Sequence, residues 1–182
     1  MGWRGGIEGG YLLFLIPARA GSKRLPGKNK RLFCGLPLWE WSLATAARVC
    51  NPDQDLPLVS SDDPDILDRT PWGQLRPSDL CSDSTATQEV IDYYWGMFLG
   101  LGHDSICLLQ PTSPTRSDSL VRMMIAHGGQ VRSVTNGQPN GQCWVYRKGH
   151  AGWIDIETER GHDIDVLADF EAAEQDMLRR FV

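Results

Sequence analysis

A strongly basic segment follows directly on an apolar run near the start of the chain. The apolar run spans residues 12–16, and the residues from Arg19 to Arg31 then include six Lys or Arg and no acidic residue. The chain as a whole carries a net charge of -5. Backbone N–H groups, small residues and positive charge at the end of a buried strand are suited to binding phosphate groups. The local reversal of charge therefore favours an anionic ligand over a merely solvated surface.

The glycine spacing in this segment excludes two common nucleotide-binding motifs. A Walker A motif has four residues between its first Gly and the Gly-Lys pair, followed by Ser or Thr. Here five residues separate Gly21 from Gly27, and Asn29 stands where the hydroxyl residue belongs. The dinucleotide fingerprint Gly-x-Gly-x-x-Gly is also missing. A solvated loop without a ligand remains the alternative interpretation of this segment.

Asp163 and Asp165 form a second group that could do chemistry. Carboxylates at positions i and i+2 of an extended segment point to the same side, and a hard divalent cation relieves their repulsion. Mg²⁺ in proteins takes one or two carboxylates and completes its shell with phosphate oxygens and water. The alternative is that Asp165 caps the following helix and Asp163 is solvated, since Asp is a favoured N-cap residue.

Composition excludes several classes of protein. The acidic net charge argues against nucleic-acid binding, and no apolar run approaches the roughly 20 residues needed to span a bilayer. The five cysteines are scattered without a C-x-x-C pair, which favours a reducing, cytoplasmic location. The four histidines lack metal-ligand spacing. We expect residues 1–10, which contain five Gly, to be a flexible leader, and residues 11–182 to form a single domain.

Short apolar runs alternate with amphipathic segments, which is typical of an α/β sheet covered by helices. The expected strands span residues 12–17, 56–60, 105–110, 131–135, 142–146 and 153–157. The expected helices span residues 38–50, 87–99, 118–127 and 166–181. A capping box formed by Thr85 and Gln88 should start the second helix, and Gly128 should end the third. The apolar spacing of the last helix predicts that it packs on the sheet.

Polar clusters lie at the ends of these strands. Ligands of open α/β sheets bind beyond the carboxyl ends of the strands, and residues 19–29, 60–63 and 110–116 each come directly after an expected strand. Residues 139–141 precede the next one. This convergence is stronger support for a binding site than any single cluster.

Six ordered motifs together resemble a known family. They are IPARAGSKRLPGKN, VSSDD, LRPSDLCSDSTAT, LLQPTSPTR, PNG and DIDVLADFEAAE, and they cover residues from about 14 to 174. The chain resembles the acylneuraminate cytidylyltransferases, which are the CMP-sialic acid synthetases and their pseudaminate and legionaminate relatives. RLPGK is also similar to the Kdo cytidylyltransferases, a sister family. The resemblance implies a Rossmann-like nucleotidyltransferase fold of three layers around a mostly parallel mixed sheet.

The resemblance also implies a reaction and a set of site residues. The family joins CTP to a 2-keto sugar acid, a small acidic sugar, and releases pyrophosphate. Arg19, Lys28, Asp163 and Asp165 would be catalytic, and the last two would bind Mg²⁺. The implied nucleotide-binding residues are Arg19, Gly21, Ser22, Lys23, Lys28, Asn29, Arg76, Ser84, Thr85 and Ala86. Gln110 and Asn140 would bind the acceptor sugar. Because phosphoryl-type transfer depends mainly on positioning and charge neutralisation, a basic loop with Mg²⁺ can supply most of the catalysis.

The chain departs from the family pattern in one important place. Members usually make a long excursion before the PNG motif, and that excursion builds the dimer interface and reaches the partner's sugar site. Here only residues 136–138 separate the expected strand from Pro139. We therefore expect a monomer or a dimer that uses a different surface. Two alternatives to a nonulosonic acid cytidylyltransferase stay open: an enzyme with another acceptor, such as Kdo or a phosphonate, and a nucleotide-binding protein without turnover.

Overall fold

The computed structural model describes residues 11–98, 101–159 and 161–179, so the predicted leader of residues 1–10 lies outside the described residues. All six expected strands and all four expected helices are present, with ends shifted by a few residues. The elements with their bounds, in chain order, are β1 (Tyr11–Pro17), η1 (Lys28–Lys30), β2 (Leu32–Phe33), β3 (Leu36–Pro37), α1 (Leu38–Val49), β4 (Leu56–Ser61), α2 (Pro64–Leu67), β5 (Gly73–Leu75), η2 (Ser78–Leu80), α3 (Thr87–Phe98), β6 (His103–Leu108), α4 (Asp118–Ala126), β7 (Val131–Thr135), β8 (Gln138–Arg147), β9 (Ile154–Glu157) and α5 (Leu167–Arg179).

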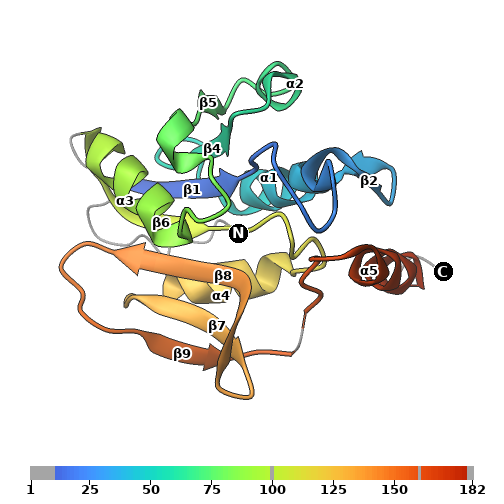
Figure 1. Ribbon diagram of the computed structural model, residues 1–182. Coiled ribbons are helices and arrows are strands. Elements are labelled where there is room, and N and C mark those ends of the chain that lie inside the picture. Colours follow the sequence, from blue (N-terminus) through green and yellow to red (C-terminus); the bar gives the residue numbers. More distant parts are fainter. Residues whose placement is uncertain (1–10, 99–100, 160, 180–182) are drawn as a thin grey trace.

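Seven of the strands form one mixed sheet in the order β5-β4-β1-β6-β8-β7-β9. β8 is antiparallel to both of its neighbours, and every other pairing in the sheet is parallel. The apolar run of β1 is buried on both faces, which suits a central strand of a parallel sheet. The carboxyl ends of β1, β4, β5 and β6 consequently meet at one edge (Figure 1). The expected α/β architecture around a mostly parallel mixed sheet is confirmed.

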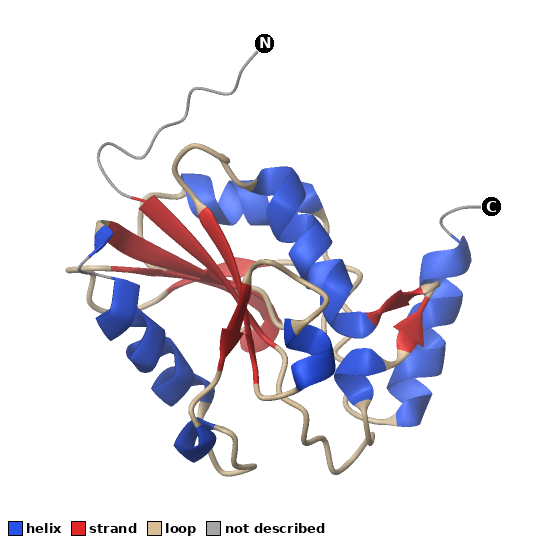
Figure 2. Ribbon diagram, turned by 90° about the horizontal axis from the view of Figure 1, so that it is seen from above, coloured by secondary structure: helices blue, strands red, loops and turns tan. Residues whose placement is uncertain are grey.

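Helices cover the sheet from both sides, so the molecule has three layers (Figure 2). α1 and α4 contact each other, and they pack on one face through Trp39, Ala46, Val121 and Met124. α3 packs on β1 and β6 of the opposite face, where Tyr94 is fully buried. The two apolar clusters fix the strand ends from which the polar loops emerge.

A third, smaller apolar cluster lies beside the main sheet. Leu25 from the basic segment, Phe33 from the β2–β3 hairpin and Phe170 from α5 are its central residues, and Figure 2 shows the hairpin next to α5. The expectation that the last helix packs on the main sheet is therefore wrong, because its buried residues contact the hairpin and the basic segment. An apolar stripe shows that a helix is buried, but it does not show against which element.

The ends of two helices test the expected capping signals. Gly128 has a φ of 78° and follows the last residues of α4, so the expected glycine stop is confirmed. The Thr85–Gln88 capping box is wrong. The carboxylate of Glu89 accepts the N–H of Ala86 at 3.1 Å, while Gln88 donates to Asp92 within the helix.

Two further properties of the described residues concern membrane-spanning helices and the cysteines. None of the described helices is long and apolar enough to cross a membrane. All five cysteines are free thiols, and Cys107 and Cys143 are buried in the core, with their sulfur atoms 3.7 Å apart.

Candidate active site

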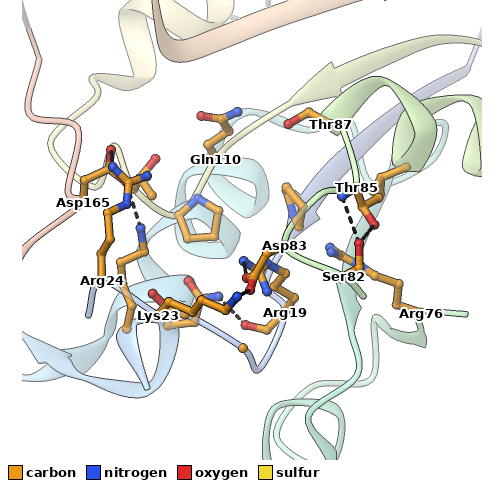
Figure 3. A pocket seen from close by; sticks show the side chains of 18 of the residues that line it. Arg19, Lys23, Arg24, Arg76, Ser82, Asp83, Thr85, Thr87, Gln110 and Asp165 are labelled. Carbon is orange, nitrogen blue, oxygen red and sulfur yellow. Dashed lines mark hydrogen bonds and ion pairs between the residues drawn. The ribbon is translucent and has the colours of Figure 1, made fainter. Parts of the chain in front are cut away.

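A cavity of about 570 Å³ opens at the edge where the parallel strands end (Figure 3). The basic segment after β1 forms one wall, and residues 76–87 with the start of α3 form another. The loop after β6 and the segment before α5 complete it. The predicted site residues that line it are Arg19, Gly21, Ser22, Lys23, Lys28, Asn29, Arg76, Thr85, Gln110, Asp163 and Asp165. Ser84, Ala86 and Asn140, which were also predicted, do not line the cavity.

The basic segment is held in place by one contact within itself and two with distant parts of the chain. The side-chain amide of Asn29 donates to the Arg19 carbonyl at 2.9 Å, which closes the segment on itself. Asp62 accepts the N–H of Ala20 at 2.7 Å, and Leu25 is buried in the third apolar cluster. Gly27 adopts a left-handed conformation with a φ of 65° at the turn into η1. Asn29 therefore shapes the phosphate-facing wall as well as lining it.

Two cations of this wall are paired with an acid from the opposite wall. Figure 3 shows Asp83 between Arg19 and Lys23, and each of the two ion pairs measures 2.6 Å. Hydrogen bonds from Lys23 and Arg19 lower the pKa of Asp83 below its ordinary value. The sequence offered no signal for this contact, because 64 residues separate Arg19 from Asp83. A polyphosphate that enters the cavity must compete with the Asp83 carboxylate for both cations.

Replacing Asp83 with Asn should strengthen polyphosphate binding. We expect the affinity for tripolyphosphate, measured by calorimetry without metal, to rise roughly two- to tenfold, because exposed ion pairs contribute little free energy. Asp79→Asn removes an exposed charge from the neighbouring η2 turn, outside the cavity, and should leave the affinity unchanged. An affinity for Asp83→Asn equal to or below that of the wild type would show that Asp83 does not compete for these cations.

Asp165 binds two further cations of the basic segment. Its carboxylate lies 2.9 Å from Arg24 and 3.5 Å from Lys28, and Lys28 also donates to the Ile164 carbonyl at 2.7 Å. Partial burial lowers the pKa of Lys28 below the ordinary value of 10.5, and the attraction of Asp165 opposes that shift. The interpretation of Asp165 as only a helix cap is wrong. Asp169 accepts the N–H groups of Asp165 and Val166 at the start of α5.

Asp163 and Asp165 both face the cavity, on the side of Arg24 and Lys28. Within the described ranges, no group of three or more His, Cys, Asp or Glu could hold a metal ion, so this pair is not a complete protein site. The donor set fits Mg²⁺, which is commonly bound by one or two carboxylates together with the phosphates of its substrate. Arg24, which sequence analysis did not single out, neutralises part of this charge.

Arg76 is buried at the far side of the cavity. It donates to the hydroxyl oxygen of Ser60 at 2.8 Å and to the Ser60 carbonyl at 3.1 Å. The Tyr94 hydroxyl also donates to the hydroxyl oxygen of Ser60, at 2.9 Å. Burial lowers the pKa of Arg76. The nearby loop is stabilised by the Ser82 hydroxyl, which accepts the N–H groups of Ser84 and Thr85. Ser84 thus shapes the loop beside the cavity.

Gln110 lies at the junction of β6 and the next loop, and its amide abuts the backbone of β8. A Cβ atom built on Gly141 would lie 2.7 Å from the Gln110 side-chain oxygen, and Gly141 has a φ of 71°. Only glycine therefore suits this position without strain. The close approach fixes the Gln110 amide at the cavity wall next to Pro111 and Thr112.

Residues 13–122 match the model of a family described as Cytidylyltransferase. The chain belongs to the cytidylyltransferase family. This match covers the basic segment, the loop around Arg76 and the Gln110 loop, and it ends before Asp163. The assignment of the acid pair to this site therefore depends on the geometry of the cavity.

The names of two curated relatives refer to legionaminic and pseudaminic acid. The chain is 38% identical over 133 residues to CMP-N,N'-diacetyllegionaminic acid synthase of Legionella pneumophila, covering 68% of this chain and 54% of the relative. It is 30% identical over 119 residues to pseudaminic acid cytidylyltransferase of Campylobacter jejuni, covering 60% and 50%. The chain spans about half the length of these relatives.

Solved structures show the same fold at low sequence identity. CMP:2-keto-3-deoxy-manno-octonic acid synthetase in complex with CTP has a TM-score of 0.69 and 15% identity, over 93% of this chain and 99% of that one. The 4-diphosphocytidyl-2C-methyl-D-erythritol synthase of Anaerococcus prevotii also has a TM-score of 0.69 and 15% identity, over 95% and 98%.

The structure differs from the expectation around the PNG motif. β8 begins at Gln138, so Pro139, Asn140 and Gly141 lie within a strand and not in a loop before it. Asn136 and Gly137 form the two-residue turn of a tight hairpin, both with positive φ. The Asn-Gly pair is the strongest short hairpin signal in a sequence, so the local sequence itself favours this turn.

Asn140 stabilises this hairpin from inside the sheet. Its side chain donates to Thr135 at 2.9 Å and to Thr158 at 2.7 Å, and it accepts from Ser133. Asn140 therefore does not line the cavity in which we predicted it to contact the acceptor sugar. Its side chain is instead hydrogen-bonded to β7 and to Thr158, the residue after β9.

Proposed function

We propose that this chain transfers CMP from CTP to a 2-keto-3-deoxy sugar acid of the sialic, pseudaminic or legionaminic type and releases pyrophosphate. The observation that carries the proposal is a single cavity that combines a basic phosphate-binding wall, an acidic pair suited to Mg²⁺ and the Gln110 amide. The names of the curated relatives support the same reaction.

In this reaction, the anomeric hydroxyl oxygen of the acid attacks the α-phosphorus of CTP. A new oxygen–phosphorus bond forms, the bond from the α-phosphorus to the bridging oxygen breaks, and pyrophosphate leaves while the hydroxyl proton passes to solvent. Arg19, Lys23 and Lys28 hold the phosphates and neutralise the charge that develops on pyrophosphate. Bound at Asp163 and Asp165, Mg²⁺ would add Lewis-acid stabilisation of the phosphoryl oxygens. Gln110 orients the acceptor.

A second candidate keeps this chemistry and changes the acceptor to Kdo or a phosphonate. The two-residue turn at Asn136 and Gly137 favours it, since the family's long excursion normally helps to define the sugar pocket. The same turn provides no arm that could cross to a partner, so we also propose a monomer or a dimer through another surface. The five free thiols support a reducing, cytoplasmic setting.

We expect pyrophosphate release with CTP, Mg²⁺ and at least one nonulosonic acid, and a clear preference for CTP over UTP and ATP. A site built to hydrogen-bond one base rejects analogues that leave its buried polar groups unpaired, and Arg76 is such a buried group. The assay is a panel of sialic, pseudaminic, legionaminic, Kdo and phosphonate acceptors tested with each nucleotide.

Each outcome of this panel has a separate meaning. Release with Kdo or a phosphonate alone selects the second candidate. CTP binding without release for any acceptor would indicate a nucleotide-binding protein without turnover. Equal binding of CTP and ATP would overturn the proposed base preference.

A further inference from the structure

Arg116 is a buried cation beneath the cavity. Only 5% of its surface is exposed, and burial lowers its pKa to about 10. Among the residues that the structure describes, no carboxylate lies within 4.0 Å of its guanidinium group. A buried charge is costly unless it is paired or hydrogen-bonded. The hydrogen-bond partners of the Arg116 guanidinium group therefore indicate its role in the structure.

Those hydrogen bonds converge on the backbone of Gln110. Arg116 donates one N–H to the Ser42 hydroxyl at 2.7 Å and another to the Gln110 carbonyl, and Ser42 lies 3.2 Å from the same carbonyl as a further donor. The N–H of Ser113 also donates to it at 3.2 Å. Three donors thus fix the turn that follows β6, and a chain of polarised hydrogen bonds is stronger than its separate members.

The same turn is connected to the acidic pair. The Thr112 carbonyl accepts the N–H of Ile164 at 2.8 Å, and Ile164 lies between Asp163 and Asp165. On its other side, the turn carries the Gln110 amide, which abuts Gly141. The carboxylate of Asp163 is among the groups whose attraction opposes the lowered pKa of Arg116. One guanidinium group therefore lies beneath both the acceptor side and the metal side of the cavity.

We propose that Arg116 is a positioning residue, which sets the Gln110 amide and the Asp163–Asp165 segment relative to each other by clamping the Gln110 carbonyl with Ser42. This inference rests on the proposed function. Arg116 does not line the cavity and acts only through the turn. Arg19 and Lys23, two of the cations that hold the triphosphate, come from the segment after β1 and pair with Asp83, away from the clamped turn.

The test compares two buried arginines. Arg147 is equally buried, and it donates to a serine hydroxyl, Ser105, and to the carbonyls of Gly129 and Ile125. Burial also lowers its pKa, but it does not line the cavity. Arg116→Lys and Arg147→Lys each keep the charge and lose the planar fork. They form a matched pair in which only Arg116 contacts the Gln110 turn.

We expect both variants to lose comparable thermal stability and to differ in function. Arg116→Lys should lower kcat and raise the KM for the acceptor, on the order of ten- to hundredfold in kcat/KM, since a small misplacement at a reacting centre has effects of that size. Its KM for CTP should stay within about threefold. Arg147→Lys should keep all three constants near those of the wild type.

A binding measurement provides a readout that does not require turnover. We expect Mn²⁺ to strengthen tripolyphosphate binding to the wild type and to Arg147→Lys, and to do so less for Arg116→Lys. Tripolyphosphate binding without metal should be equal in all three proteins. If no acceptor supports turnover in the wild type, the proposed function fails, and this comparison still decides the role of Arg116.

Equal kinetic constants and equal Mn²⁺ effects for the two lysine variants would overturn the proposal. If Arg116→Lys does not fold, Ser42→Ala decides, because it removes one donor to the Gln110 carbonyl and keeps the arginine. We expect the same pattern of changes in Ser42→Ala at smaller size. A Ser42→Ala protein with unchanged acceptor KM and unchanged Mn²⁺ effect would then contradict the clamp.

Discussion

Asp163→Asn and Asp165→Asn should each lower the rate of pyrophosphate release by about a hundred- to ten-thousandfold, because metal stabilisation of a phosphoryl transition state contributes several kcal/mol. Both substitutions keep the size of the side chain and remove a charge from the cavity wall. Pyrophosphate release at saturating Mg²⁺ is the measurement. Asp155→Asn is the control and should retain the wild-type rate, because Asp155 of β9 forms an exposed ion pair with Arg132 of β7, outside the cavity.

The two substitutions should differ when no metal is present. Asp165 pairs with Arg24 and Lys28, so Asp165→Asn releases two cations into the cavity. We expect its metal-free affinity for tripolyphosphate to rise by roughly two- to tenfold. The same affinity should rise less in Asp163→Asn. Near-normal turnover of both variants at saturating Mg²⁺ would show that the pair does not serve catalysis.

Lys28→Met should weaken CTP binding by about ten- to hundredfold at low ionic strength, because a hydrogen bond to a charged group contributes about 1.5–3 kcal/mol. Lys28 is largely shielded from solvent, so salt screens its contacts less than those of exposed Lys23. Lys30→Met is the matched control, because Lys30 pairs with Asp63 and Asp65 and does not line the cavity. Calorimetry at two salt concentrations measures both effects.

The lowered pKa of Lys28 also predicts how tripolyphosphate binding depends on pH. Burial lowers its pKa below 10.5, so Lys28 loses its positive charge at a lower pH than an ordinary lysine as the solution becomes alkaline. As the pH rises, the affinity of the wild type for tripolyphosphate should therefore begin to fall before the pH reaches 10.5. Lys28→Arg keeps its charge at that pH and should delay the fall. An unchanged CTP affinity in Lys28→Met would instead support the interpretation of the basic segment as a solvated loop without a ligand.

The local pattern of the sequence was sufficient for the main elements of the fold. The apolar run of β1, the amphipathic spacing of α1, α3 and α4, and the glycine after α4 each depend on neighbours in the chain. The short elements were missed. The β2–β3 hairpin has strands of two residues each, and α2 has a single turn, which are too short for a periodic signal.

The sequence by itself determined which loops gather at the carboxyl edge of the sheet, because strand direction follows from the alternation of strands and helices. It did not determine how the side chains in those loops pair. The contacts of Asp83 with Arg19, of Asp165 with Arg24 and of Arg116 with Gln110 join segments that meet only in the folded chain. Ion pairs and hydrogen bonds depend on distances of a few ångströms. Only the tertiary structure decided those distances, and with them that Asn140 stabilises the hairpin while Gln110 faces the cavity.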